Sequence, residues 1–209
     1  MEIKRAGEGQ IIFLHDGIAS ARPMMWIAVG CIALVAVATV FGGSWLSLVV
    51  VLVAGGLILS MLRNASARTA AVFDRAHGTL EITHTRGGAI VGEEDVALGD
   101  VSDVIVEPAT GGTGVTAGQH LSLRPSLSVG DRLVPLTYRA FEGGSRPIEA
   151  AEEIRAFLGR PRDNLFEDSV TILAQCSDRV QPAVRLARLG LGLDRLEAAE
   201  MVERLREGE

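Results

Sequence analysis

Residues 23–62 read PMMWIAVGCIALVAVATVFGGSWLSLVVVLVAGGLILSML, and this stretch decides the predicted fold. It holds two apolar segments, 24–41 and 45–62, each 18 residues long and neither containing Asp, Glu, Lys, Arg or His. At about 1.5 Å rise per residue, a helix of this length measures about 27 Å, close to the hydrocarbon thickness of a bilayer. A core helix of a soluble protein would show a polar face over such a length. The stretch therefore predicts a transmembrane helical hairpin over 23–62 that turns at Gly42-Gly43-Ser44.

The residues around the two segments predict how the hairpin is oriented. Basic residues flank its outer ends, and the connecting turn has none. Under the positive-inside rule, both termini are expected on the cytoplasmic side. The side chains expected to anchor the hairpin at the membrane interface are Arg22, Trp26, Trp45 and Arg63. Small residues permit close helix contact, and those expected to provide it are Gly30, Ala33, Ala36, Gly55 and Gly56.

The N-terminal segment, 1–22, is polar except for the apolar run 10–14, which Asp16-Gly17 follows. Such a run is typical of a strand and turn, or of a short interfacial segment. A strand this short is expected to add to another sheet, which would be the sheet that follows the hairpin.

After Thr69 the sequence changes to short runs separated by turn residues, which is typical of antiparallel strands. In the run 79–85, Leu80 and Ile82 alternate with polar residues and are expected to face inward. The expected strands are 70–74, 79–85, 89–91, 101–107, 119–127 and 132–137. Six short strands imply a small, bent antiparallel sheet or barrel. A helix over 147–158, which begins at Pro147 and ends before Gly159, is expected to cap it and complete a domain over 69–160.

The order of these elements carries a resemblance to a known family. Together with the runs VFDR at 72–75, DVSDV at 100–104, LVPLT at 133–137 and AAEEIRAFLG at 150–159, it resembles bacterial two-helix membrane proteins with a pleckstrin-homology-like domain. The resemblance implies a bent sheet capped by a helix, used for binding or scaffolding at the bacterial inner membrane. It carries over no catalytic residue.

A helical tail is predicted over 163–209. Asp194 and Glu197 have the spacing of a capping box, and the glycine-containing turn 190–193 would join two helices into a helix–turn–helix hairpin. The run 183–203 also resembles the C-terminal domain of the ribosomal stalk protein, without the lysines of that family, so factor binding is not carried over. The tail is expected either to contact a partner protein or to form a lid on the preceding domain. The apolar residues expected to contact a partner are Leu186, Leu189, Leu193, Met201 and Leu205.

Charge and composition exclude several classes of partner. The formal net charge is −6, and the acidic excess lies after the hairpin. An acidic surface repels phosphate backbones, so we expect no nucleic-acid partner. Two cysteines, Cys31 and Cys176, are too few for a disulfide framework. The four histidines lack the paired spacing of a zinc site, and we expect neither a metal nor another cofactor.

Two stretches have the composition of a reactive site without its context. The glycine-rich run 112–117 follows an expected strand, but a dinucleotide site needs a helix next, and the following residues are typical of another strand. The second stretch is an acidic cluster, expected to be a solvated loop because a catalytic carboxylate pair usually needs burial. It comprises Glu93, Glu94, Asp95, Asp100 and Asp103. We therefore expect no catalytic residue and no enzymatic activity.

The sequence thus predicts a membrane α-helical hairpin plus an α+β domain with a short helical tail. Its predicted function is that of a non-catalytic accessory, assembly or scaffolding subunit of a larger membrane protein complex. Its expected partners are the membrane and other subunits of that complex, and no small-molecule ligand is expected. The alternative is a membrane-anchored sensor that binds a neutral or apolar ligand or lipid in the pleckstrin-homology-like domain. A third hypothesis is an enzyme that uses the loop 110–118.

Overall fold

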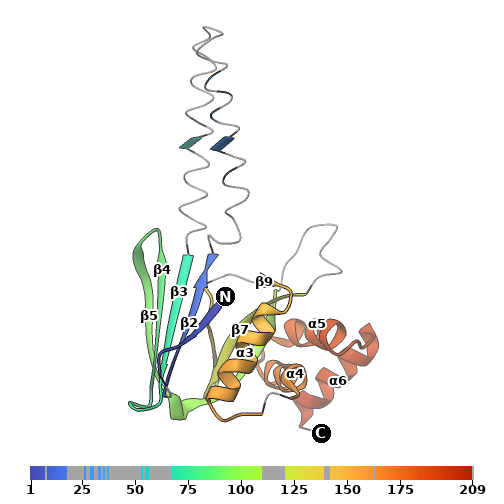
Figure 1. The fold of residues 1–209 in the computed structure, drawn as a ribbon. Helices are drawn as coiled ribbons and strands as arrows, with labels where there is room; N and C mark the ends of the chain where they lie inside the picture. The colour runs from blue at the N-terminus through green and yellow to red at the C-terminus, as the bar shows by residue number, and fades with distance from the viewer. Residues whose placement is uncertain are drawn as a thin grey trace.

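The computed structural model describes residues 1–7, 9–17, 26, 29–30, 33, 35, 37, 53, 55–56, 67–109, 121–138, 142–161 and 163–208. Within these residues the chain forms two antiparallel β-sheets and then four α-helices (Figure 1). The helices lie together on one side of the molecule, and the first sheet lies on the other (Figure 1).

The first sheet has five strands, which are neighbours in the order in which the chain forms them. They are β1 (Glu2–Arg5), β2 (Gln10–Asp16), β3 (Ala67–Asp74), β4 (Thr79–Arg86) and β5 (Ala89–Ala97). β2 covers the run 10–14 and pairs with β3, with Asp16 opposite Arg68. Successive side chains of a strand point to opposite faces, and on one face of this sheet Phe13, Phe73 and Leu80 are fully buried.

The second sheet is built around β7 (Ser122–Val129), which pairs with β6 (Val101–Pro108), β8 (Arg132–Pro135) and β9 (Glu142–Gly143). A 3₁₀ turn at Leu98–Asp100 separates it from β5. Six of the eight residues of β6 are buried. Because successive side chains of a strand point to opposite faces, burial at this density means that both faces of β6 are covered.

The helix α3 (Arg146–Phe157) joins the two sheets. Pro147 lies in its first turn, where the missing backbone N–H costs no helical hydrogen bond. Ile154 is fully buried, and the Phe157 ring meets the edge of Phe73 of the first sheet with centroids 6.3 Å apart. The helix therefore fills the space between the sheets, consistent with its place in Figure 1.

The tail consists of α4 (Leu165–Gln175), α5 (Val180–Gly190) and α6 (Arg195–Glu207). The predicted capping box is confirmed, since the Asp194 side chain accepts from the N–H of Glu197 and the Glu197 side chain accepts from the N–H of Asp194. This arrangement satisfies backbone donors that have no partner inside the helix and sets the beginning of α6.

The tail is docked on the second sheet through polar as well as apolar contacts. The buried Ser169 hydroxyl of α4 accepts a hydrogen bond from the Val106 N–H of β6 at 3.0 Å. Arg185 of α5 donates to the Ala109 carbonyl at 2.8 Å, just after β6 ends. Of the two roles expected for the tail, these contacts correspond to a lid on the preceding domain.

The predicted fold class is corrected in its β-domain. The structure has two sheets in place of a single bent sheet or barrel. The turn at 98–100 lies between β5 and β6, which belong to different sheets, and the segment before the predicted hairpin supplies two strands of the first sheet. The result is an α+β arrangement of two antiparallel sheets and four helices within the described residues.

The predicted membrane hairpin is also corrected. No helix in the described residues is both long enough and apolar enough to cross a membrane. The segments 24–41 and 45–62 lie outside the described residues except at 26, 29–30, 33, 35, 37, 53 and 55–56. The predicted spanning helices, membrane partner and inner-membrane location are corrected on the finding that the described residues contain no such helix. Apolar length is necessary for a membrane span, but by itself it does not demonstrate one.

Candidate functional site

A cleft of about 900 Å3 lies where the second sheet meets the tail. Its walls come from the start of β6, the β7–β8 turn, the end of α4 and the residues before α5. Four of its five charged side chains are held in ion pairs: Asp103 with Arg155 at 3.2 Å, Arg132 with Glu94 at 2.6 Å, and Arg179 with Asp178 at 3.2 Å, whereas Asp131 has no ion pair in the described residues. Charges that compensate one another in this way leave little field for an ionic ligand, and the polar walls do not suit an apolar one.

Cys176 is the nucleophilic side chain in this cleft. Burial raises the pKa of its thiol, and the Asp178 carboxylate raises that pKa further. The thiolate is the reactive form of cysteine, so this environment makes Cys176 a weak nucleophile. The described lining also holds no histidine that could serve as its base. The cleft is therefore a poor candidate for covalent catalysis.

The described histidines lie apart from this cleft. His77 forms a hydrogen bond with Asp74 at 2.9 Å, and this bond is the main cause of the lowered pKa of the Asp74 carboxyl. His84 lies on β4, with its Nδ1 2.9 Å from the Thr69 hydroxyl and its ring against Tyr138. His15 is buried on β2. Within the described residues, no three His, Cys, Asp or Glu side chains gather as a metal site would require. His120 and the loop 110–118 lie outside the described residues.

The acidic cluster differs most from its predicted structure. Glu93, Glu94 and Asp95 were expected in a solvated loop, but they lie in the strand β5. Pairing with β4 imposes the extended conformation on residues with low intrinsic strand propensity. Asp100 belongs to the 3₁₀ turn, and Asp103 belongs to β6. The cluster is therefore divided among three elements.

β5 is the outer strand of the first sheet, and within the described residues it pairs with β4 alone. Figure 1 shows it at the margin of the molecule, on the side away from the helices. Only one of its nine residues is buried, compared with six of eight in β6. The opposite outer strand, β1, has four residues and lies beside α3, where Arg5 is 3.5 Å from Glu153. β5 is thus a long and open edge whose backbone groups can accept another strand.

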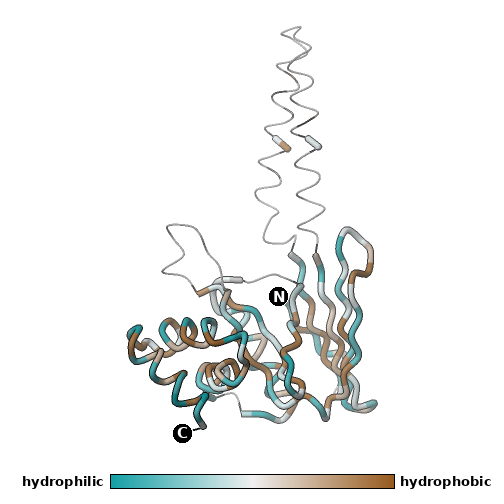
Figure 2. The backbone as a smooth tube through the Cα atoms, turned by 180° about the vertical axis from the view of Figure 1, so that it is seen from behind, coloured by the Kyte–Doolittle hydropathy of each residue, from teal (hydrophilic) through white to brown (hydrophobic). Residues whose placement is uncertain are grey.

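The two halves of β5 differ in their chemistry. Near the β4–β5 turn, Ile90 is 60% exposed and Val91 is 46% exposed, and Figure 2 shows a hydrophobic stretch at this tip. Val91 falls at a register shift, because Gly92 pairs with His84 while Ile90 pairs with Thr85. Toward the end of the strand, Glu93 and Asp95 are exposed.

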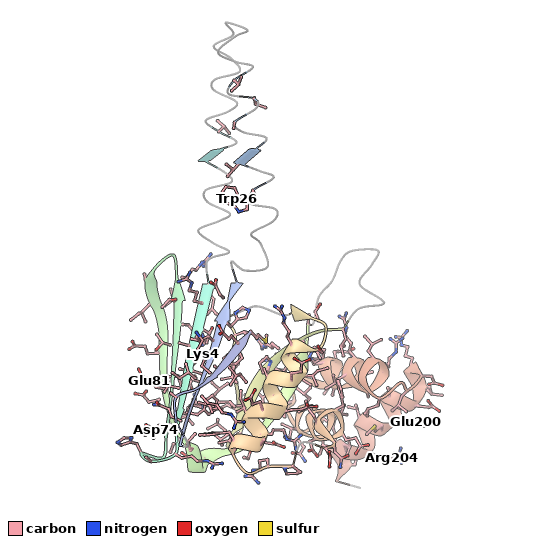
Figure 3. All side chains as sticks on the ribbon, in the orientation of Figure 1. Lys4, Trp26, Asp74, Glu81, Glu200 and Arg204 are labelled. Atoms are coloured by element: carbon pink, nitrogen blue, oxygen red, sulfur yellow. The ribbon has the colours of Figure 1, made fainter. Side chains whose placement is uncertain are left out.

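The residues predicted as membrane-interface or helix-contact sites form no common site in the described structure. Trp26 is 69% exposed and lies beyond the sheets and helices (Figure 3). Gly30, Ala33 and Gly56 are exposed and Gly55 is partly buried. A Cβ added at Gly30, Gly55 or Gly56 would meet nothing within 4 Å. Arg22, Ala36, Trp45 and Arg63 lie outside the described residues.

The predicted partner-binding residues of the tail are divided between its core and its surface. Leu186 is fully buried. Leu193, Met201 and Leu205 are partly buried against the core, and Leu189 is 38% exposed. Most of this apolar surface is therefore packed inside the protein.

Sequence reasoning did not single out the edge of β5, although a signal was present. Gly87-Gly88 between two polar–apolar runs is typical of a two-residue hairpin turn. A hairpin with an eight-residue first strand predicts a second strand of similar length, which would extend through the acidic residues.

No protein-family model, curated protein or solved structure matches this chain. The resemblances to pleckstrin-homology-like membrane proteins and to the ribosomal stalk protein stay predictions.

Proposed function

We propose that this protein is a non-catalytic scaffolding or assembly subunit that binds another protein by strand addition at the open edge of β5. The observation that carries the proposal is the exposure of this nine-residue outer strand of the first sheet, whose core side chains Phe13, Phe73 and Leu80 are fully buried. A rigid sheet with an unpaired edge offers main-chain hydrogen bonds to an extended segment, and side chains next to the edge supply the selectivity.

The rest of the described structure supports binding rather than chemistry. Most charged groups of the cleft between the second sheet and the tail are held in ion pairs, and its thiol is held in the unreactive form by the raised pKa of Cys176. The tail is bound to the second sheet by the hydrogen bond that the Ser169 hydroxyl accepts from the Val106 N–H and by the one that Arg185 donates to the Ala109 carbonyl. The proposed binding surface thus lies on the first sheet, whereas the tail packs on the second sheet.

Site-specific cross-linking followed by hydrogen exchange tests the proposal. A photoreactive amino acid in place of Val91 should form a discrete cross-linked adduct with the partner protein. The same group in place of the exposed Glu200 of α6 should form no such adduct. The protein identified from the adduct is then purified and mixed with the intact chain. It should slow amide exchange in β5 and leave exchange in α6 unchanged, because added ladder hydrogen bonds protect only the edge. No adduct specific to Val91, or a bound partner that leaves β5 exchanging as before, would overturn the proposal.

A further inference from the structure

The partner at the β5 edge can be described by its chemistry, if the proposed strand addition holds. The sheet register places Asp95 directly opposite Glu81 of β4, and Glu93 opposite Thr83. Val96, the next residue of β5, is 6% exposed and faces the core. Because strand side chains alternate, Glu93, Asp95 and Glu81 therefore share the outer face of the sheet.

The negative charges of these three carboxylates are not compensated by basic side chains in the described residues. In the described residues, no ion pair joins Glu81, Glu93 or Asp95 to a basic side chain, whereas the neighbouring Glu94 is held by Arg132. Glu81 lies on the part of the first sheet that is remote from the helices (Figure 3). Directly opposed residues of an antiparallel pair have Cβ atoms about 5 Å apart, and like charges in that position are destabilising. The sheet thus keeps an unfavourable pair at the edge where another strand would bind.

From this register we infer that the β5 edge binds an extended segment of a different protein that carries Lys or Arg at alternate positions. In an added strand, two residues two positions apart lie opposite Asp95 and Glu93 and become their cross-strand neighbours. Basic side chains there would compensate the group of three carboxylates. The open edge supplies the hydrogen bonds, and the carboxylates decide which strand is accepted.

The same residues disfavour a second copy of this chain that pairs through the acidic part of β5. In an antiparallel β5–β5 pair centred on Glu94, each Glu93 would lie opposite the Asp95 of the other copy. That arrangement adds like-charge pairs across the new interface, a device by which sheet proteins avoid edge-to-edge association.

The exposed Ile90 and Val91 add a second requirement. They lie before the acidic residues along β5. An antiparallel partner, which matches the other strand pairs of this sheet, would place its apolar residues after its basic ones. The expected segment therefore reads basic, any residue, basic, followed within about three residues by an apolar side chain.

Fluorescence anisotropy of the intact chain with labelled peptides tests this inference. The probe is a blocked peptide Thr-Lys-Thr-Lys-Thr-Val-Ile, and its comparison peptide has Glu in place of both Lys. At low salt the Lys peptide should bind at least about tenfold more tightly than the Glu peptide, because two attractive cross-strand pairs replace two repulsive ones. At about 0.5 M NaCl, where the Debye length is about 4 Å, this difference should shrink.

Variants of the chain separate charge from backbone pairing. The double variant Glu93→Gln/Asp95→Asn should lose about tenfold in affinity for the Lys peptide and show an equal or higher Tm, since a like-charge pair is removed. Glu200→Gln on α6 is the matched control and should bind as the parent does. A Lys peptide with alternate backbone N-methyl groups, made in both phases, should lose binding in at least one phase, because methylation removes ladder donors.

The outcomes distinguish this inference from the proposed function on which it rests. Equal affinity for the Lys and Glu peptides, with loss on N-methylation, would overturn the basic partner and leave strand addition in place. Binding that survives N-methylation in both phases, or no binding of any peptide, would overturn both. Concentration-dependent dimerisation of the parent chain that Val91→Pro abolishes would instead identify a second copy as the occupant and overturn the inference.

Discussion

Arg155 of α3 and Asp168 of α4 form an ion pair in which the arginine is 1% exposed. The same guanidinium contacts Asp103 of β6, with Nε 3.2 Å from the carboxylate oxygen. One buried side chain thus joins the capping helix, the first helix of the tail and the second sheet. Buried guanidinium groups need compensating charge, and here two elements supply it.

Replacing this arginine should loosen the attachment of the tail. Arg155→Met keeps most of the apolar volume but leaves Asp103 and Asp168 without their shared cation, and we expect a loss of about 3 kcal/mol in the free energy of unfolding. Urea unfolding followed by circular dichroism measures this change. The control is Arg206→Met, which removes an exposed ion pair with Glu203 and should cost at most about 0.5 kcal/mol. Equal effects of the two substitutions would show that the buried contact does not stabilise the fold.

Ser169→Ala should destabilise the interface between α4 and β6. The substitution removes the acceptor of the Val106 N–H in a site where both residues are fully buried. A buried donor left without a partner costs about 1–3 kcal/mol, and amide exchange at Val106 should accelerate. Thr171→Ala on the same helix is the control, because its hydroxyl donates to the Glu167 carbonyl in an exposed position. If the two variants have the same stability, the Ser169 hydrogen bond makes no net contribution.

Gly190→Ala should be destabilising although alanine is the better helix former. A Cβ added at Gly190, the last residue of α5, would lie 2.6 Å from the Phe166 ring of α4. Overpacking of this kind costs about 1–3 kcal/mol, more than the gain in helix propensity of about 1 kcal/mol. Thermal unfolding measures the balance. Gly99→Ala, where the added Cβ meets nothing within 4 Å, is the control.

A second substitution tests the cause of the Gly190 effect. Phe166→Leu shortens the side chain that meets the new Cβ, so the double variant should be more stable than the sum of the two single effects implies. Additive losses would place the strain of Gly190→Ala somewhere other than the α4–α5 contact.

The stability of the first sheet should fall as the pH drops through the range of histidine titration. Burial lowers the pKa of His84 below its ordinary value of 6.5, although Glu94 partly opposes the shift. Near and below that value the unfolded chain binds a proton that the folded chain does not, so the free energy of unfolding decreases with falling pH. His84→Gln should make the decrease between about pH 7.5 and about pH 5.5 shallower, as measured by urea unfolding at each pH. An unchanged slope would assign the pH dependence to other groups.

The alternation of apolar residues carried much of the strand prediction. The run 79–85 corresponds to β4, and Leu80 and Ile82 are fully buried as the period-two pattern requires. Helix signals were equally informative, since the expected helix 147–158 corresponds to α3 at Arg146–Phe157 and the capping box begins α6. Local chemistry decides these elements, so the sequence shows them directly.

Other elements form only because a neighbour is in place. β1, Glu2–Arg5, has no apolar alternation, and it becomes a strand by pairing with β2. β5 carries three consecutive acidic residues of low strand propensity and is extended by its register with β4. The candidate site lies on β5, so the sequence alone did not reveal it. The division into two sheets depends on the turn at 98–100, which has no strong sequence signature.

The ladder between β2 and β3 has a mechanical consequence. The chain leaves β2 and returns at β3 next to the opposed residues Asp16 and Arg68, whose side chains lie 3.5 Å apart. Any tension in the intervening residues 18–66 would pull these two strands apart from one end. The rungs of the ladder would then be loaded one after another, as in a zipper, rather than all at once as in shear. The force that the first sheet withstands would therefore be set by the rung at Asp16 and Arg68 and not by the total number of rungs.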